Sequence, residues 1–213
     1  MRAIGAVLLW LLASGCSQSA AEPAASRRQS ASVDPTVFEG RISLKPGDRR
    51  NLPLPGGERR PIDSLLAVPS PLRYGQFVWN DVGVPTGRPW IRIDLTTQTL
   101  SVFRGKHEIG TAVILYGADS HVTPSGRFPI LAKFEEHRSS IYGAAMPFTL
   151  KLTGDGVAIH GSDVRYDAAT HGCIGIPEAF AKRLFAATSS GDLVYIISDR
   201  NDAELSGATR AAT

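Results

Sequence analysis

The residues best suited to covalent chemistry gather between positions 160 and 173. An apolar stretch ends at His160, and after nine further residues the chain continues with Thr170, His171, Gly172 and Cys173. A free thiol has a pKa of about 8.5, so at neutral pH it needs a neighbouring imidazole to take its proton or to stabilise the thiolate. We therefore predict that Cys173 is a nucleophile and that His160, at the end of a strand, is its general base.

Gly172 lies directly before the candidate nucleophile. A glycine permits a sharp backbone turn, which can aim the amides around Gly172 and Cys173 at a carbonyl oxygen that becomes negative during attack. This pattern favours attack of the thiol on a carbonyl group. Two other interpretations stay open: Cys173 as a small buried side chain, and a zinc site of His160, His171 and Cys173 with His121 or an acid. The chain contains neither His-x-x-x-His nor Cys-x-x-Cys, and we expect no metal or cofactor.

Short strands separated by turns are expected to position these residues. One helix is predicted over about 177–187, because Pro177 suits a first helical turn and Phe180, Leu184 and Phe185 recur on one face. The sequence thus predicts a mostly β, sandwich-like fold with one helix in its C-terminal half. Apolar alternation and β-branched residues predict strands over 90–95, 100–103, 109–116, 128–134, 148–152, 157–160 and 193–197.

Composition and charge limit the function classes. The chain has 213 residues, 43% hydrophobic and 20% charged, which fits one compact domain with tails rather than a disordered or multispanning membrane protein. With 23 Lys and Arg against 20 Asp and Glu, the net charge is only +3. The basic residues form no cluster, so we expect no nucleic-acid partner. We also expect a monomer.

The first residues resemble an export signal. A positive start at residues 1–2 precedes nine apolar residues, 4–12, and small residues then lead to Cys16. The ending Leu-Ala-Ser-Gly-Cys resembles the cleavage site of bacterial lipoproteins, which implies an acylated Cys16 and a lipid anchor in the cell envelope, facing the periplasm. Ser17 resembles the residue found in lipoproteins sorted to the outer membrane. The alternative is ordinary secretory cleavage with release into the periplasm.

These observations divide the chain into five parts. They are a signal peptide (1–16), a flexible, disordered linker (17–36), an irregular arm of uncertain packing (37–89), a catalytic-type domain (90–198) and a disordered tail (199–213). The linker has almost no large apolar side chains, so burial cannot offset its conformational entropy.

Three separated motifs follow one another along the chain: the strand pair beginning Ile93-Asp94-Leu95, the element Thr123-Pro124-Ser125-Gly126-Arg127-Phe128, and His160-Gly161 with Thr170-His171-Gly172-Cys173. Together they resemble the L,D-transpeptidase catalytic-domain (YkuD-like) family, over roughly residues 90–197. The resemblance implies a YkuD-like, β-sandwich-type catalytic domain that acts on peptidoglycan stem peptides. In this family a Cys attacks the L,D peptide bond after the third residue, usually diaminopimelate, and passes the acyl group to an amine or to water.

The resemblance also implies a role for individual residues. It makes Cys173 the nucleophile, His160 the base, His171 a second histidine that positions or stabilises, and Gly172 part of the oxyanion site. Two alternatives remain: an L,D-carboxypeptidase or endopeptidase-type hydrolase of the same fold, and a catalytically weakened peptidoglycan-binding lipoprotein. The residues expected to contact the substrate are Thr170, Arg165 and Tyr142.

Two departures from the family pattern bear on substrate choice. Gly175 stands where an Arg or Asn is commonest, and the loop between His160 and Thr170 has only nine residues. Arg165 in this loop is a candidate replacement for the missing cation.

Other histidines and one loop complete the expectations. Residues 139–148 contain Gly and Pro and are predicted to form a loop over the site. His107 and His137 are expected in solvated loops, and His121 at the surface rather than in the cleft.

Overall fold

The computed structural model describes residues 40–45, 47, 50–68, 71–117, 121–140 and 142–198. Three predictions lie outside the described residues: the signal peptide (1–16) with the lipidation site Cys16, the linker (17–36) and the tail (199–213). Within the described part of the chain, no helix is long and apolar enough to cross a membrane.

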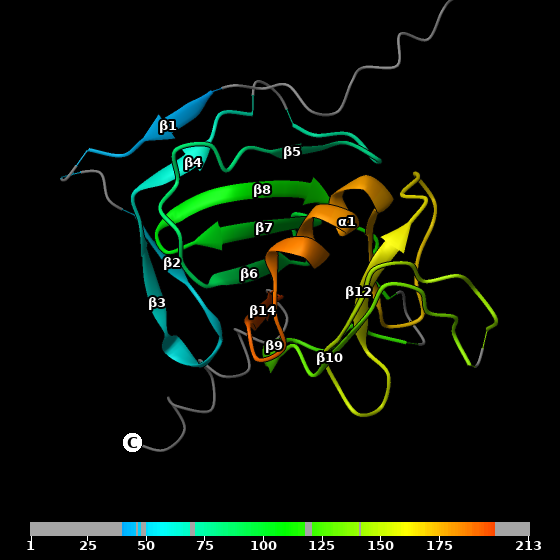
Figure 1. Cartoon of the computed structure of the whole chain (residues 1–213). Coiled ribbons are helices and arrows are strands. Elements are labelled where there is room, and N and C mark those ends of the chain that lie inside the picture. Colours follow the sequence, from blue (N-terminus) through cyan, green and yellow to red (C-terminus); the bar gives the residue numbers. More distant parts are fainter. Residues whose placement is uncertain are drawn as a thin grey trace, which may run out of the picture. The chain divides into compact units, whose positions relative to one another are not determined.

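A mixed sheet of eight strands forms one layer of the fold (Figure 1). Its centre is an antiparallel meander of β6 (Pro89–Asp94), β7 (Thr99–Arg104) and β8 (His107–Val113). β14 (Leu193–Ile197) lies parallel to β6, and β9 (Gly126–Pro129) pairs antiparallel with β14. The meander predicted from the alternating sequence is confirmed, although His107 lies in β8 rather than in a loop.

A second sheet has four strands. In spatial order they are β10 (Ala132–Phe134), β11 (Thr149–Lys151), β12 (Ala158–Ser162) and β13 (Ile174–Pro177), and the β12–β13 pair is parallel. The sequence did not predict β13, because its Gly and Pro are typical turn residues. Pairing with β12 makes this segment a strand.

The single strand predicted over 128–134 is wrong, because the chain changes sheets within it. The amide of Ile130 donates to Asp192 O (2.9 Å), directly before β14 of the larger sheet, whereas the amide of Leu131 donates to Lys151 O (2.8 Å) in the smaller one. The two halves therefore become β9 and β10. The apolar pattern alone could not show this, because apolar residues run without a break from Phe128 to Ala132.

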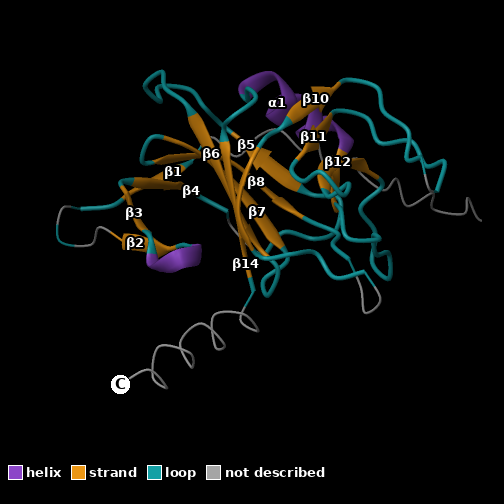
Figure 2. Cartoon of the chain, turned by 90° about the horizontal axis from the view of Figure 1, so that it is seen from below, coloured by secondary structure: helices purple, strands orange, loops and turns teal. Residues whose placement is uncertain are grey.

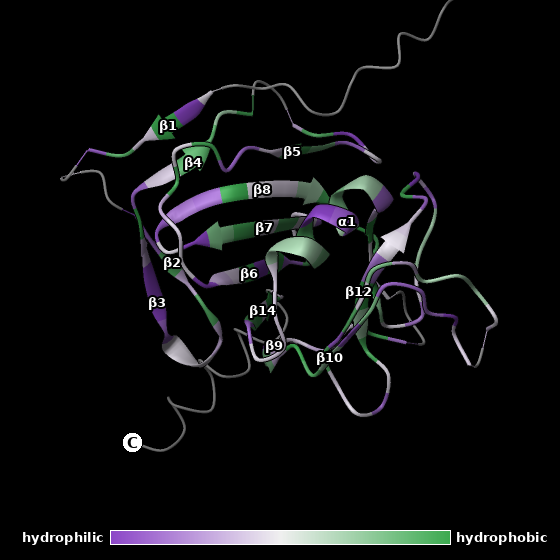
Figure 3. Ribbon diagram, in the orientation of Figure 1, coloured by the Kyte–Doolittle hydropathy of each residue, from purple (hydrophilic) through white to green (hydrophobic). Residues whose placement is uncertain are grey.

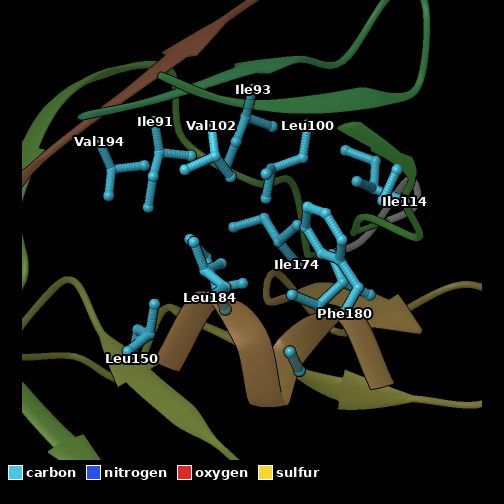
Figure 4. Close-up of a cluster of buried hydrophobic side chains, with 14 of the residues drawn as sticks. Ile91, Ile93, Leu100, Val102, Ile114, Leu150, Ile174, Phe180, Leu184 and Val194 are labelled. Atoms are coloured by element: carbon cyan, nitrogen blue, oxygen red, sulfur yellow. The ribbon is translucent and has the colours of Figure 1, made fainter. Parts of the chain in front are cut away.

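The core lies between the two sheets and includes α1 (Glu178–Ala187) (Figure 4). The helix buries Phe180 and Leu184, as predicted, and begins directly after Pro177. Figure 2 shows strands throughout the described chain with this helix and one short 3-10 turn, so the mostly β fold with one helix is confirmed. Other labelled core residues are Ile91, Ile93, Leu100, Val102, Ile114, Leu150, Ile174 and Val194.

Lys133 closes the C-terminal end of α1. Its ammonium group donates hydrogen bonds to Phe185 O (2.6 Å) and Thr188 O. The last carbonyl groups of a helix lack partners within the helix, and a cation there is stabilised by the helix dipole. The side chain of Lys133 therefore points to the helix side of β10, and those of Ala132 and Phe134 point to the other side.

Part of the segment 40–89, whose packing the sequence left open, extends the larger sheet. β1 (Arg41–Ser43) pairs with β4 (Ser64–Leu66), and β4 and β5 (Phe77–Trp79) both pair with β8. The sheet order is β1-β4-β8-β7-β6-β14-β9, with β5 off this path. Strands of three residues leave little periodic signal in a sequence, so such elements are hard to predict.

A separate hairpin covers the outer face of the larger sheet. β2 (Arg50–Pro53) and β3 (Arg59–Ile62) are joined by the 3-10 turn η1 (Pro55–Gly57). Figure 3 shows β3 as mainly hydrophilic, in contrast to the hydrophobic part of β7. The hairpin and the sheet share a second apolar cluster, made by Leu54, Ile62, Trp90, Phe103 and Tyr195.

Candidate active site

Cys173 and His160 belong to the same face of the smaller sheet, opposite to the core. Ile159 and Ile174 are register partners, and both are buried in the core. Side chains alternate along a strand, so their neighbours His160 and Cys173 project to the other face. Continuing the register by one residue sets Cys173 beside Ala158. His160 is two residues further along β12, a diagonal separation that side chains can span.

The thiol of Cys173 is free and partly exposed. It donates a hydrogen bond to Gly156 O (3.5 Å), in the turn before β12. Burial raises the pKa of the Cys173 thiol above its ordinary value, and the backbone amide of Ala158 opposes this in part. The thiol is therefore protonated at neutral pH, so its attack on a carbonyl group needs a base.

The imidazole of His160 is buried, and its Nδ1 lies 2.9 Å from Gly161 O. A carbonyl oxygen only accepts hydrogen bonds, so Nδ1 carries the proton and Nε2 carries the lone pair. Burial lowers the pKa of His160, the Gly161 carbonyl raises it in part, and the nearby His137 lowers it further. A neutral imidazole with a basic Nε2 is the form that a general base requires.

In the resting site, both the thiol and the imidazole are uncharged. Among the described residues, no hydrogen bond joins the Cys173 sulfur to the His160 ring. The sulfur donates to Gly156 O, and Nδ1 of the ring donates to Gly161 O. Proton transfer to Nε2 therefore requires the Cys173 side chain to leave the Gly156 carbonyl. His137, expected in a solvated loop, is exposed, but it is close enough to affect the pKa of His160.

Two hydroxyl groups hold the turn that carries the thiol. Gly172 has φ +96°, a backbone conformation that favours glycine. Its carbonyl accepts a hydrogen bond from Thr123 Oγ1 (3.0 Å), which itself accepts one from the amide of Gly117 (2.9 Å). Thr170 Oγ1 donates to Cys173 O. The sequence singled out Thr123 only as part of a motif and Gly117 not at all, so it missed this support.

His171 lies against two other rings. It stacks on Tyr142, with ring centroids 4.2 Å apart, and meets His121 edge-on at 5.4 Å. Tyr142 is 49% exposed, so this aromatic cluster borders solvent. The structure thus joins Tyr142 to His171, both of which the sequence assigned to the site. It also brings in His121, which is exposed as expected but contacts His171.

The zinc interpretation finds no ligand set in this geometry. Within the described ranges, no group of three or more His, Cys, Asp or Glu side chains is arranged to hold a metal ion. His160 uses Nδ1 for the Gly161 carbonyl, and the contacts of His171 are with aromatic rings.

Gly175 stands in a crowded place. It exchanges two backbone hydrogen bonds with Leu115, of 2.8 and 2.9 Å. A Cβ at position 175 would lie 3.1 Å from Ser162 Cβ and 3.4 Å from Leu115 Cβ, so a large side chain would displace these neighbours.

Arg165, the candidate replacement cation, forms an ion pair of 3.0 Å with Asp163, and both side chains are largely exposed, 73% and 76%. The charge of Arg165 is therefore already paired at the surface.

We expect iodoacetamide to alkylate Cys173 more slowly than free cysteine at neutral pH. Burial raises the pKa of the thiol, and only the thiolate reacts, so the rate should rise with pH and reach its midpoint above that of free cysteine. Mass spectrometry of digested protein separates Cys173 from Cys16, with N-acetylcysteine as the reference. A rate already maximal below neutral pH would indicate a thiolate–imidazolium pair and contradict this expectation.

Comparisons with known proteins give one family. The model of the YkuD family, described as the L,D-transpeptidase catalytic domain, matches residues 88–196. Among 46 matching chains of solved structures, an L,D-transpeptidase (Yku) from Stackebrandtia nassauensis is 23% identical, covers 54% of this chain and 57% of its own, and has a TM-score of 0.49. A comparison with curated proteins gave no match.

Two structures from Mycobacterium tuberculosis are similar to the same degree. One L,D-transpeptidase is 20% identical, with 52% of this chain and 57% of its own covered and a TM-score of 0.48. Another, in complex with a faropenem-derived adduct, is 18% identical, with 52% and 61% covered and a TM-score of 0.47. This chain thus spans little more than half the length of these solved relatives.

Proposed function

The chain belongs to the L,D-transpeptidase catalytic domain (YkuD) family, and from this premise we propose that it is a cysteine acyltransferase of the bacterial cell wall. Its substrates are the stem peptides of peptidoglycan, cleaved at the L,D peptide bond after the third residue. The acyl group then passes to an amine, which gives a cross-link or an attached protein, or to water, which gives a trimmed stem.

The proposed reaction begins with proton transfer from the Cys173 thiol to Nε2 of His160. The sulfur attacks the carbonyl carbon of the third residue, and the carbonyl oxygen becomes an oxyanion. The C–N bond breaks as the imidazolium returns the proton to the leaving amine, so that the terminal D-residue departs and a thioester remains. An acceptor amine or water then attacks the thioester, loses its proton to His160, and the Cys173 thiolate leaves and takes that proton back.

The register of β12 and β13 is the observation that carries this proposal. It sets Cys173 and His160 on one sheet face as diagonal neighbours, although thirteen positions separate them in the chain. The tautomer of His160 supports the same roles, because the Gly161 carbonyl keeps the proton on Nδ1. The positive φ of Gly172 supports an oxyanion site formed by the amides around Cys173.

A hydrolase of the same fold is the second candidate. Cys173 is partly exposed, which favours access of water to a thioester. The crowded glycine at position 175 favours a third reading, in which the site binds stem peptides but turns them over poorly. The balance among these activities depends on the acceptor, and analysis of the products with and without an amine separates them.

We also propose a location in the cell envelope, on its periplasmic side. The export pattern of residues 1–16 supports it, and an acylated Cys16 would anchor the protein to a membrane, the outer membrane by analogy with Ser17. The proposal includes a monomer that needs no cofactor.

The direct test is to incubate the full chain with disaccharide tetrapeptides, with and without an acceptor amine. We expect release of the terminal D-residue, and a cross-linked product when the amine is present. A carbapenem, which members of the family accept as a mimic of the stem, should leave one covalent adduct on Cys173 in mass spectrometry. Absence of D-residue release, cross-links and adduct would overturn the enzymatic proposal.

A further inference from the structure

Lys151 lies on the sheet face that carries the candidate active site. Its neighbour Leu150 is buried in the core, so the side chain of Lys151 projects to the opposite face of β11. Lys151 is the register partner of Ala158, and one further step of the β12–β13 register sets Ala158 beside Cys173. Lys151, Ala158 and Cys173 therefore form one row across three strands.

The dimensions of this row leave room for a small anion. Neighbouring strands lie about 4.8 Å apart, so the backbones of Lys151 and Cys173 are separated by about 10 Å. An extended lysine side chain reaches roughly 6 Å from its Cα. Ala158 between them contributes only a methyl group, over which the lysine stem can lie. The ammonium group can thus come close to the thiol, with space for one carboxylate group between them.

Lys151 is the only Lys, Arg, Asp or Glu on this face of the four strands. The other lysine of these strands, Lys133, points to the opposite side, toward the end of α1. Lys151 has no ion-pair partner among the described residues, whereas Arg165 is paired with Asp163. The other residues that alternate onto the site face are Ala132, Phe134, Thr149, Ala158, His160, Ser162, Gly175 and Pro177.

We propose that Lys151 binds the carboxylate of the terminal D-residue of the donor stem. Lys151 would thus provide a positive charge in a site where position 175 is a glycine instead of an arginine. This inference rests on the proposed function. In a peptide, the carboxyl carbon of the terminal residue lies roughly 3 to 4 Å from the preceding carbonyl carbon, the one that Cys173 attacks. A stem bound with that carbonyl at the sulfur can therefore place its free carboxylate within reach of the Lys151 ammonium group. A further residue would replace this carboxylate by an uncharged amide.

The test compares two donors, a tetrapeptide with a free terminal carboxylate and the same peptide with a terminal amide. For the carboxylate donor, Lys151→Met should lower kcat/KM by about 10- to 100-fold, mainly through KM, as expected for loss of one charge-assisted contact. For the amide donor, kcat/KM should change by less than about threefold, because this donor has no terminal carboxylate for Lys151 to bind. Lys151→Arg should keep most of the preference for the carboxylate.

Lys182→Met is the matched control. Lys182 is exposed on α1, which packs against the other side of the sheet, so the same substitution there should leave both donors unaffected. A loss in Lys151→Met that is equal for both donors would overturn the proposal. The proposal would also be overturned if the loss in Lys151→Met disappeared only for a donor whose third residue has an amidated side-chain carboxylate. That result would show that Lys151 binds the side chain of the third residue.

Binding to the Cys173→Ala protein separates this proposal from the proposed function. Calorimetry with this variant measures Kd without turnover, and the free-carboxylate peptide should bind about 10-fold more tightly than the amide, a difference that Lys151→Met removes. If the wild type never forms a thioester but this difference remains, the acyl-transfer proposal fails and Lys151 is still a carboxylate-binding residue. If Kd is the same for both peptides, the role of Lys151 is disproved.

Discussion

Cys173→Ala is expected to lower the release of the terminal D-residue by at least about 10,000-fold, because the variant has no atom that can form the thioester. Alanine fits without strain: the thiol donates a weak hydrogen bond of 3.5 Å to the Gly156 carbonyl and is partly exposed. The melting temperature should therefore change little. Chromatography measures release of the D-residue, and mass spectrometry of the intact protein detects the acyl-enzyme.

His160→Gln should reduce kcat by about 100- to 10,000-fold, the range for loss of general acid–base catalysis. Glutamine can still donate to the Gly161 carbonyl, which keeps the buried contact of Nδ1. It cannot accept the thiol proton. The matched control is His107→Gln, since His107 lies in β8, where its ring bonds to Ser64 Oγ (2.9 Å). Equal activity of His160→Gln and His107→Gln would remove His160 from the mechanism.

Gly117→Ala is expected to reduce turnover by about 100-fold or more, although Gly117 has no reacting group. A Cβ on Gly117 would lie 1.9 Å from His121 O and 2.6 Å from the amide nitrogen of Gly172, so the backbone must move. A displacement of about 1 Å in the segment that carries Cys173 is enough for such a loss. Overpacking should also lower the free energy of unfolding by about 1 to 3 kcal/mol. Turnover and urea unfolding measure the two effects.

Two further variants separate geometry from unfolding. In Gly87→Ala the new Cβ meets only Arg104 Cγ, at 3.9 Å, so stability and turnover should be unchanged. Thr123→Val keeps the shape of the side chain but removes the hydrogen bonds to Gly117 and Gly172. It should reduce turnover in the same direction as Gly117→Ala. Full activity in both Gly117→Ala and Thr123→Val would show that this support is unnecessary.

Much of the candidate site was predictable, because its residues form local motifs. The order His160, His171, Gly172, Cys173 and the chemistry of a thiol beside imidazoles need no knowledge of the fold. The helix was predictable for a similar reason: Phe180 and Leu184 are four positions apart, a spacing that places both side chains on the buried face of a helix. Each of these signals lies within a short window, where sequence periodicity and residue type decide the outcome.

The tertiary structure alone decided which distant residues share the site. Strand register sets Lys151 in the row of Cys173, and hydrogen bonds connect Thr123 and Gly117 to Gly172. It also divided 128–134 between two sheets and placed β1, β4 and β5 beside β8. Strand pairing arises from hydrogen bonds and core burial between segments far apart in the chain, so no local pattern records it. The amino-acid sequence by itself therefore determined which side chains could carry out the chemistry and the class of fold, whereas the residues that surround those side chains were determined only when the sheets formed.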